Sequence, residues 1–191
     1  MKNIVQPEAI RSLLPYFAYG KVVHGFGRGS RELGCPTANM SDQVVSEFPE
    51  ALPCGVYYGF ANVDNGTVYR MVTSVGWNPQ FNNTKKSIET HIMNDFGQDF
   101  YGSLLKIMML GYLRPMRSFP SLDALKQAIQ TDILDAHQIL ASPELQIFSS
   151  HAFFKPGGEV HIPHAHKILD IIPDPNQNTS AGGNDAEKSM T

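Results

Sequence analysis

Cysteine is scarce in this chain of 191 residues, which contains only Cys35 and Cys54. They lie too far apart for a C-x₂-C pair and have no partners for a zinc site, so we interpret them as reduced intracellular thiols. No apolar run approaches the roughly 20 residues that span a bilayer. Residues 1–11 lack the apolar core of a signal peptide and the arginines of a presequence. These absences predict a cytoplasmic protein with no membrane partner.

An excess of basic residues is also missing. The formal net charge is −3 and the pI is near 6.1, whereas proteins that bind nucleic acids or anionic membranes are usually basic. A barrel of the OB type that binds single-stranded nucleic acid requires a basic groove with stacking aromatics. The acidic pI therefore argues against that class as well.

The length suits one domain with a substantial core, and no internal repeat is visible. With 42% hydrophobic and 17% charged residues, the composition is ordinary for a soluble globular protein. Residues 173–191 are rich in Asp, Asn, Ser, Gly and Pro and have almost no apolar residues. We therefore predict one domain over residues 1–172 and a disordered polar tail over residues 173–191.

Most predicted elements are strands. An aromatic and β-branched run over 55–63 and a returning run over 68–75 flank Asn65-Gly66, which predicts a hairpin. The remaining predicted elements are strands at 22–23, 87–93 and 102–113, a short helix over 10–17 that leads into the first strand, and a helical turn around 44–45.

A long helix is predicted after these strands. Ser121 is a good N-cap, Asp123 lies in the first turn, and the helix continues to about residue 140. Its apolar residues recur at three and four and predict one buried face, made of Leu122, Leu125, Ile129, Ile133, Ala136 and Leu140. Closely spaced strands followed by one helix predict a mainly β fold, a closed antiparallel, Greek-key-like β-barrel with the helix packed against it or plugging it.

The stretch 20–39 is the most informative part of the sequence. From Gly25 onward it places glycine at three alternate positions, which reduces one face of a strand to bare backbone. Glycine within a strand often marks the close approach of a ligand or of another backbone. Arg28, Ser30 and Arg31 add positive charge and a hydroxyl, which suits a phosphate chain. The alternative is a glycine-rich β-turn region.

This stretch matches neither of the common phosphate loops. The Walker pattern requires Gly-Lys-Ser/Thr, whereas Gly20-Lys21 is followed by valine. The Rossmann fingerprint also fails, because Gly25-x-Gly27 lacks the third glycine at its proper spacing and no helical pattern follows.

Two oxygen-bearing side chains follow a proline in the second half of the stretch. Pro36 favours extended backbone around it, and in an extended chain Thr37 and Asn39 point the same way. Mg²⁺ takes such hard oxygen ligands when water and substrate phosphate complete its shell. The pattern indicates Mg-nucleotide binding, with a Thr/Asn turn after proline as the alternative.

A glutamate interrupts the predicted strand 87–92. Ser87, Glu89 and His91 alternate with the more apolar residues on the other face. An acidic side chain on a packed strand is costly unless it faces an open pocket. Phosphoryl transfer to an alcohol requires a carboxylate that orients the hydroxyl and accepts its proton. Glu89 is therefore the candidate base, and a surface strand glutamate is the alternative.

Taken together, these stretches resemble the riboflavin kinase family. The stretch 20–39 is similar to the family pattern Gly-x-Gly-Arg-Gly-Ser…Leu-Gly-x-Pro-Thr-Ala-Asn, whose Pro-Thr-Ala-Asn element is highly specific after a glycine-rich strand. Residues 83–92 resemble its Asn-Thr-Lys-Lys-Ser-x-Glu-Thr-His-Ile element. Three more motifs resemble the eukaryotic enzyme in order and spacing: Gly76–Pro79, Asp99–Gly102 and Gly111–Pro115. The resemblance covers about residues 15–140, and residues 141–191 are not matched.

The resemblance implies a riboflavin kinase-like split barrel that transfers the γ-phosphoryl of Mg-ATP to the ribityl 5′-hydroxyl of riboflavin, giving FMN and ADP. The metal implied is Mg²⁺ or another divalent ion such as Zn²⁺. The residues implied are Glu89 for catalysis; Gly25, Arg31, Thr37, Asn39, Ile92, Asn94 and Tyr101 for the nucleotide; Thr37 and Asn39 for the metal; and Arg114, Arg117 and Phe119 for the flavin. We expect Glu89 to lie across the barrel from the donor site.

The sequence departs from the family at three of these positions. Arg31 and Arg117 stand where relatives often have lysine, and Asn94 stands where some have histidine. Arginine and lysine differ in the geometry of their contacts.

A non-catalytic flavin-binding barrel is the main alternative, but a decayed enzyme need not keep Thr37, Asn39 and Glu89 together. No nucleotide-binding pattern precedes Gly20 or follows Leu140, so we expect a monofunctional, monomeric kinase that does not make FAD.

Three other features each allow a functional and a purely structural interpretation. His161, His164 and His166 could form a metal cluster or a solvated loop. Lys85-Lys86 could contact phosphate or be a solvated pair, and Trp77 could stack on the flavin or serve in packing.

Overall fold

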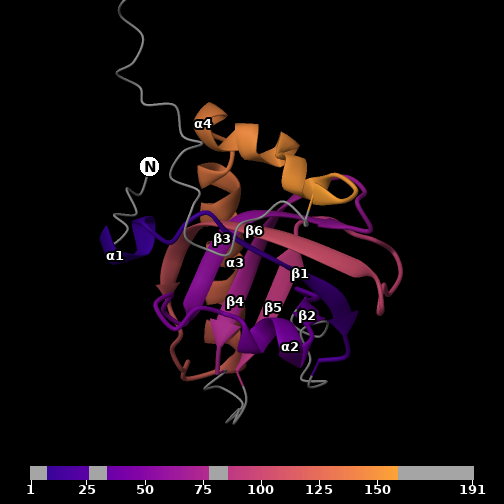
Figure 1. The fold of residues 1–191 in the computed structure, drawn as a ribbon. Helices are drawn as coiled ribbons and strands as arrows, with labels where there is room; N and C mark the ends of the chain where they lie inside the picture. The colour runs from indigo at the N-terminus through magenta and orange to yellow at the C-terminus, as the bar shows by residue number, and fades with distance from the viewer. Residues whose placement is uncertain (1–7, 26–33, 78–85, 159–191) are drawn as a thin grey trace, which may run out of the picture.

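The computed structural model describes residues 8–25, 34–77 and 86–158 (Figure 1). Within these residues six strands form a closed antiparallel barrel in the order β1-β2-β5-β4-β3-β6. The strands are β1 (Tyr16–Val23), β2 (Ala38–Met40), β3 (Gly55–Val63), β4 (Tyr69–Gly76), β5 (Ser87–Ile92) and β6 (Leu104–Pro115). The predicted closed barrel is confirmed.

The predicted hairpin joins β3 and β4. Asp64 and Asn65 have φ angles of 50° and 58°, and the Gly66 N–H donates to the Val63 carbonyl at 2.9 Å. Asn and Asp tolerate this left-handed conformation, and a turn with two such residues matches the twist of paired strands. Local turn chemistry therefore sets the register of this hairpin.

Alternation along the strands divides the packed side chains into two clusters. Inside the barrel lies the first cluster, to which every strand contributes: Ile10, Tyr16, Ala18, Val22, Ala38, Met40, Phe48, Leu52, Tyr57, Ala61, Met71, Val75, Ile88, Ile92, Leu105, Ile107 and Met109. The second lies on the outside of β3, β4 and β6: Val56, Tyr58, Phe60, Val72, Met108, Ala136, Leu140, Phe153 and Phe154. Strands β3 and β6 are therefore covered on both faces.

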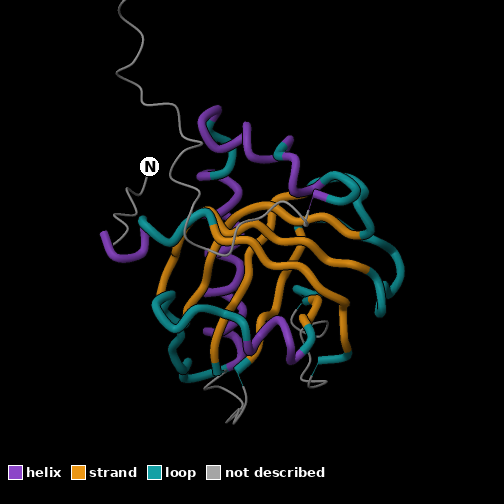
Figure 2. The backbone as a smooth tube through the Cα atoms, in the orientation of Figure 1, coloured by secondary structure: helices purple, strands orange, loops and turns teal. Residues whose placement is uncertain are grey.

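Helix α3 (Leu122–Ile139) supplies the cover on the outside, and it lies behind the strands in Figures 1 and 2. The Ser121 hydroxyl accepts a hydrogen bond from the Ala124 N–H at 3.1 Å, so the predicted N-cap is confirmed. The helix packs on the barrel wall and does not plug an end. Leu122, expected on the buried face, is 54% exposed because it lies in the first turn, beyond the contact.

The N-terminal segment differs from expectation. Helix α1 (Glu8–Arg11) ends early, and β1 begins at Tyr16 instead of Val22. Phe17, expected on the helix, lies in the strand, and its ring packs edge-on against Phe153 with the centroids 5.0 Å apart. Pairing of Tyr16–Lys21 with β6 outweighs the local helical spacing.

A segment after α3, which the sequence left unassigned, packs back onto the barrel. It comprises α4 (Pro143–Gln146) and the 3₁₀ turns η2 (Ile147–Ser150) and η3 (Ala152–Phe154). The fully buried Lys106 ammonium donates to the carbonyls of Phe153 at 3.1 Å and Lys155 at 2.8 Å. Its cross-strand neighbour Asn62 donates to the Phe154 carbonyl at 3.0 Å. These polar contacts hold η3 on the outer cluster.

The turn predicted around 44–45 is helix α2 (Asp42–Ser46), which follows β2. Among the described residues, no helix is long and apolar enough to cross a membrane.

Candidate active site

Strand β5 places Glu89 on the outer wall of the barrel. Its neighbours Ile88 and Thr90 are buried, so alternation turns Glu89 outward. The register pairs Glu89 with Asn39 of β2 on one side and with Ser74 of β4 on the other. The expectation that Glu89 lies across the barrel from the Thr37–Asn39 pair is therefore wrong. Sequence separation gave no indication that β2 and β5 are adjacent.

Two hydroxyl groups surround the Glu89 carboxylate. Thr37 Oγ1 donates to Oε2 at 3.5 Å, and Ser87 Oγ donates to Oε1 at 3.0 Å. Glu89 itself is half-buried. A carboxylate with one face accessible and its oxygens oriented by neighbours can accept a proton from an incoming hydroxyl. Ser87 was not predicted as a site residue, and its alternation with Glu89 was the signal.

His91 orients the loop that carries Thr37. Its Nδ1 lies 3.0 Å from the carbonyl oxygen of Pro36, which accepts the hydrogen bond from the Nδ1–H tautomer. The contact ties the segment before β2 to β5, beside Glu89. Alternation predicted that His91 shares a strand face with Glu89, but it indicated no role for the imidazole.

Gly25 lies against the side chain of Asn39. A Cβ added at Gly25 would stand 2.4 Å from Asn39 Nδ2 and 3.2 Å from Oδ1. The close neighbour at this glycine is the Asn39 side-chain amide, whereas the sequence indicated a ligand or another backbone. Any larger residue would displace that amide.

The oxygen atoms gathered here fit a magnesium ion in their chemistry. Thr37 and Asn39 supply neutral oxygens and Glu89 a carboxylate, all from β5 and the β2 region, and Mg²⁺ prefers such ligands with water and phosphate. Among the described residues, no three His, Cys, Asp or Glu side chains gather into a metal cluster.

Three more of the predicted nucleotide residues, Ile92, Asn94 and Tyr101, lie near the ends of β1 and β5. The Tyr101 ring stacks on His24, beside Gly25, with the centroids 3.7 Å apart and 46% of Tyr101 exposed. The Ile92 side chain is part of the barrel core, and the Asn94 amide donates to the Asp95 carbonyl at 3.2 Å. The structure thus brings Tyr101 close to Gly25 through His24.

The predicted flavin residues lie at the other end of the barrel. Val56 pairs with Arg114, but Tyr57 pairs with Tyr112, so β6 has a bulge at Leu113. A bulge re-aims side chains, and here it leaves Arg114 on the outer wall, facing α3. Phe119 lies between two guanidinium groups, with its centroid 5.5 Å from Arg114 Cζ and 5.0 Å from Arg117 Cζ.

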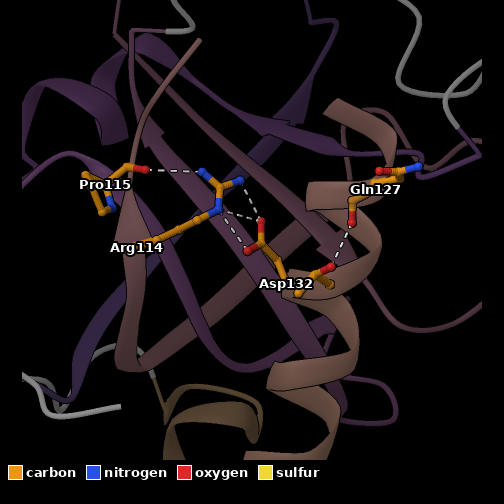
Figure 3. Close-up of polar contacts among 5 residues, drawn as sticks. Arg114, Pro115, Gln127 and Asp132 are labelled. Atoms are coloured by element: carbon orange, nitrogen blue, oxygen red, sulfur yellow. Dashed lines mark hydrogen bonds and ion pairs between the residues drawn. The ribbon is translucent and has the colours of Figure 1, made fainter. Parts of the chain in front are cut away.

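Asp132 on α3 is the partner of Arg114 (Figure 3). Arg114 Nη2 donates to Asp132 Oδ2 at 2.7 Å, and Nε donates to Oδ1 and Oδ2 at 2.9 Å and 3.1 Å. Burial raises the pKa of the Asp132 carboxyl, and this effect outweighs the opposing hydrogen bond and charge of Arg114. Asp132 was not predicted as a site residue. The signal was a carboxylate at helical spacing between Ile129 and Ala136, on the buried face of the helix.

The Asn39–Glu89 pair and the predicted flavin residue Arg114 belong to one cross-strand row. The register links Asn39, Glu89, Ser74, Val56 and Arg114 across β2, β5, β4, β3 and β6. Neighbouring strands lie about 4.8 Å apart, so three strand spacings put about 14 Å between the backbones of Glu89 and Arg114.

Several predicted features fall outside the described residues. They are Arg28, Ser30 and Arg31, with the two glycines between Gly25 and Ser30, as well as Lys85, the histidines at 161, 164 and 166, and the tail 173–191.

The structure thus places a carboxylate, a hydroxyl and an amide side by side on the wall of a closed barrel, and these oxygen groups suit phosphoryl transfer. The sequence profile of the Flavokinase family, described as riboflavin kinase, matches residues 13–140. The chain therefore belongs to the riboflavin kinase family.

Relatives agree with this assignment. The chain is 52% identical to riboflavin kinase from Homo sapiens over 142 residues, which is 74% of this chain and 92% of that protein. It is 50% identical to the riboflavin kinase from Mus musculus over the same shares. The crystal structure of riboflavin kinase from Trypanosoma brucei is similar with a TM-score of 0.58 and 33% identity, over 72% of this chain and 87% of that one.

Proposed function

We propose that this protein phosphorylates riboflavin, transferring the γ-phosphoryl of ATP to the ribityl 5′-hydroxyl to give FMN and ADP. The observation that carries the proposal is the Glu89 carboxylate, which lies beside Thr37 and Asn39 on the outer wall of a barrel from the riboflavin kinase family.

Glu89 accepts the proton in this scheme. The 5′-hydroxyl oxygen forms a bond to the γ-phosphorus, the bond from that phosphorus to the β–γ bridging oxygen breaks, and the hydroxyl proton passes to a Glu89 oxygen. Ser87 and Thr37 orient the carboxylate through their hydroxyls.

Thr37 and Asn39 are the proposed ligands of Mg²⁺, which when bound neutralises charge on the phosphates. Gly25 leaves room for the Asn39 amide, because a Cβ at this position would lie 2.4 Å from Asn39 Nδ2. Tyr101, held by the His24 ring, is proposed to cover the nucleotide. Arg31 shares the nucleotide contact in the same proposal, as do Ile92 and Asn94.

The acceptor is proposed to bind at Arg114, Arg117 and Phe119, where the aromatic ring and the guanidinium faces can stack on a flavin and the exposed Arg117 can donate hydrogen bonds. A cross-strand row of paired residues joins this site to Glu89 through Ser74 and Val56.

We propose that the kinase domain extends beyond the matched residues 13–140. The support is the packing of Phe153 and Phe154 into the outer cluster. We also propose that the protein is a monomer in the cytoplasm.

The test is direct. Purified protein is incubated with riboflavin, ATP and Mg²⁺, and flavin products are separated by chromatography. FMN formation is expected, and no FMN with Mg²⁺, Mn²⁺ or Zn²⁺ would overturn the proposal.

A further inference from the structure

The Arg114 guanidinium has its hydrogen-bonding edges occupied by protein groups. Nε and Nη2 donate to the Asp132 carboxylate, and Nη1 donates to the Pro115 carbonyl at 3.1 Å (Figure 3). An Arg–carboxylate fork of this kind fixes the plane of the guanidinium as well as its place. The face of the group remains available for stacking.

The fork is protected from water. The side chains of Arg114 and Asp132 are 20% and 10% exposed. A surface ion pair contributes little, because its partners move and are screened, but removing one partner of a buried pair leaves the other charge uncompensated. Arg114 therefore depends on Asp132 for its charge balance and for its orientation.

Phe119 in turn depends on Arg114. Residues 116–119 have no regular secondary structure, so the position of the ring depends on contacts other than strand pairing. The ring lies 5.5 Å from Arg114 Cζ on the protected fork and 5.0 Å from Cζ of the exposed Arg117. A cation within about 6 Å of an aromatic face is attracted to it. Of these two cations, only Arg114 is anchored by the fork to α3.

We propose that Asp132 is a positioning residue for the acceptor site: it orients Arg114, and through Arg114 the Phe119 ring, so that α3 sets the affinity for the flavin. This inference rests on the proposed function, because it takes the Arg114–Phe119 segment as the place where riboflavin binds. Asp132 itself touches no substrate in this scheme. Its effect is confined to the acceptor, because the Thr37–Glu89 end of the site is held by β2 and β5.

The test compares Asp132→Asn with Leu125→Ala. Leu125 is on the same helix and 9% exposed, so its truncation loosens α3 while leaving the Arg114 fork intact. Riboflavin affinity is measured by flavin fluorescence without ATP, and KM is measured for riboflavin and for ATP. For Asp132→Asn we expect the riboflavin Kd and KM to rise about tenfold, the loss of one charge-assisted contact, with the ATP KM within about twofold. Leu125→Ala lowers the Tm and leaves the riboflavin Kd unchanged.

Two outcomes overturn the inference: an unchanged riboflavin Kd in Asp132→Asn, or an equal rise in Leu125→Ala, which would show a general effect of loosening α3. If Asp132→Asn does not fold, Asp132→Glu replaces it. That variant keeps the charge and shifts the fork, so a raised riboflavin Kd with the wild-type Tm supports positioning and an unchanged Kd rejects it. Absence of FMN from the wild-type protein, with riboflavin still bound, overturns the proposed function alone.

Discussion

The Thr37 hydroxyl lies 3.5 Å from Oε2 of Glu89, although 52 positions separate the two residues in the sequence. Strand β2 is only three residues long, yet its pairing with β5 brings the two side chains together. The proposed metal ligands and the proposed base therefore form a single group on adjacent strands. A change at one of them is expected to affect the others.

Glu89→Gln removes the proposed proton acceptor with almost no change in shape. We expect kcat to fall by about 10²–10⁴-fold, the usual contribution of a positioned general base, while riboflavin binding stays close to wild type. FMN chromatography and flavin fluorescence measure the two effects. Glu144→Gln, at an exposed glutamate of α4, is the matched control. Near-normal turnover in Glu89→Gln would remove Glu89 from this role.

Gly25→Ala tests the contact with Asn39. The added Cβ would lie 2.4 Å from Asn39 Nδ2, so the amide must move. Because that amide is the end of a side chain, the fold tolerates the shift, and the expected effect is a severalfold rise in the KM for Mg-ATP at an unchanged Tm. Gly66→Ala, in the β3–β4 turn, is the control and should leave the KM for Mg-ATP alone. An unchanged KM in Gly25→Ala would separate Asn39 from nucleotide binding.

Phe153→Ala tests whether the segment after α3 is part of the folded domain. Phe153 is 1% exposed in the outer cluster, and truncating a buried phenylalanine costs about 3–5 kcal/mol in the free energy of unfolding. Urea denaturation measures this loss. Ile147→Ala, at a residue that is 62% exposed, should change stability by less than about 0.5 kcal/mol. Equal small effects would show that the domain ends before η3.

His151, the N-cap residue of η3, is expected to make the free energy of unfolding depend on pH. Burial lowers the pKa of His151 below its ordinary value of 6.5, and its Nδ1 accepts a hydrogen bond from the Phe153 N–H at 3.1 Å, which requires that nitrogen to be unprotonated. Below pH 6.5 the unfolded chain thus binds more protons at this residue than the folded one does. Its contribution to stability is present above pH 6.5 and is lost as the pH falls through the folded pKa.

His151→Asn keeps a cap acceptor and removes the titration. Urea unfolding at pH 7.5 and at lower pH values is therefore expected to show a flatter pH dependence in the variant than in the wild type. Parallel curves for the two proteins would show that His151 does not titrate in this range.

Much of the barrel could be predicted because its signals are local. The Asn65-Gly66 turn determined a hairpin, and the Ser121 cap and the apolar spacing determined α3. The start of β1 could not be predicted, because Phe17 fits a helix or a strand until β6 is present to pair with it.

The site was predictable in its members and not in its arrangement. Thr37, Asn39 and Glu89 carried a sequence signature, but the adjacency of β2 and β5 is a property of barrel closure. Asp132 could not be predicted as a site residue, because a carboxylate within an apolar helical stripe indicates an ion pair only when a cation is known to face it. Arg114 faces Asp132 because the bulge at Leu113 turns Arg114 to the outer wall.

Because α3 covers the outer faces of β3 and β6, the Glu89–Asn39 group and the Arg114 group are expected to differ in how easily local unfolding disrupts them. Glu89 and Asn39 are held by barrel strands whose hydrogen bonds break only when the barrel itself opens. Arg114 relies on α3, which is attached from outside and can detach while the strands stay paired. The proposed acceptor end is therefore expected to open more readily than the proposed phosphate end, and flavin release could then precede any loosening of the nucleotide site.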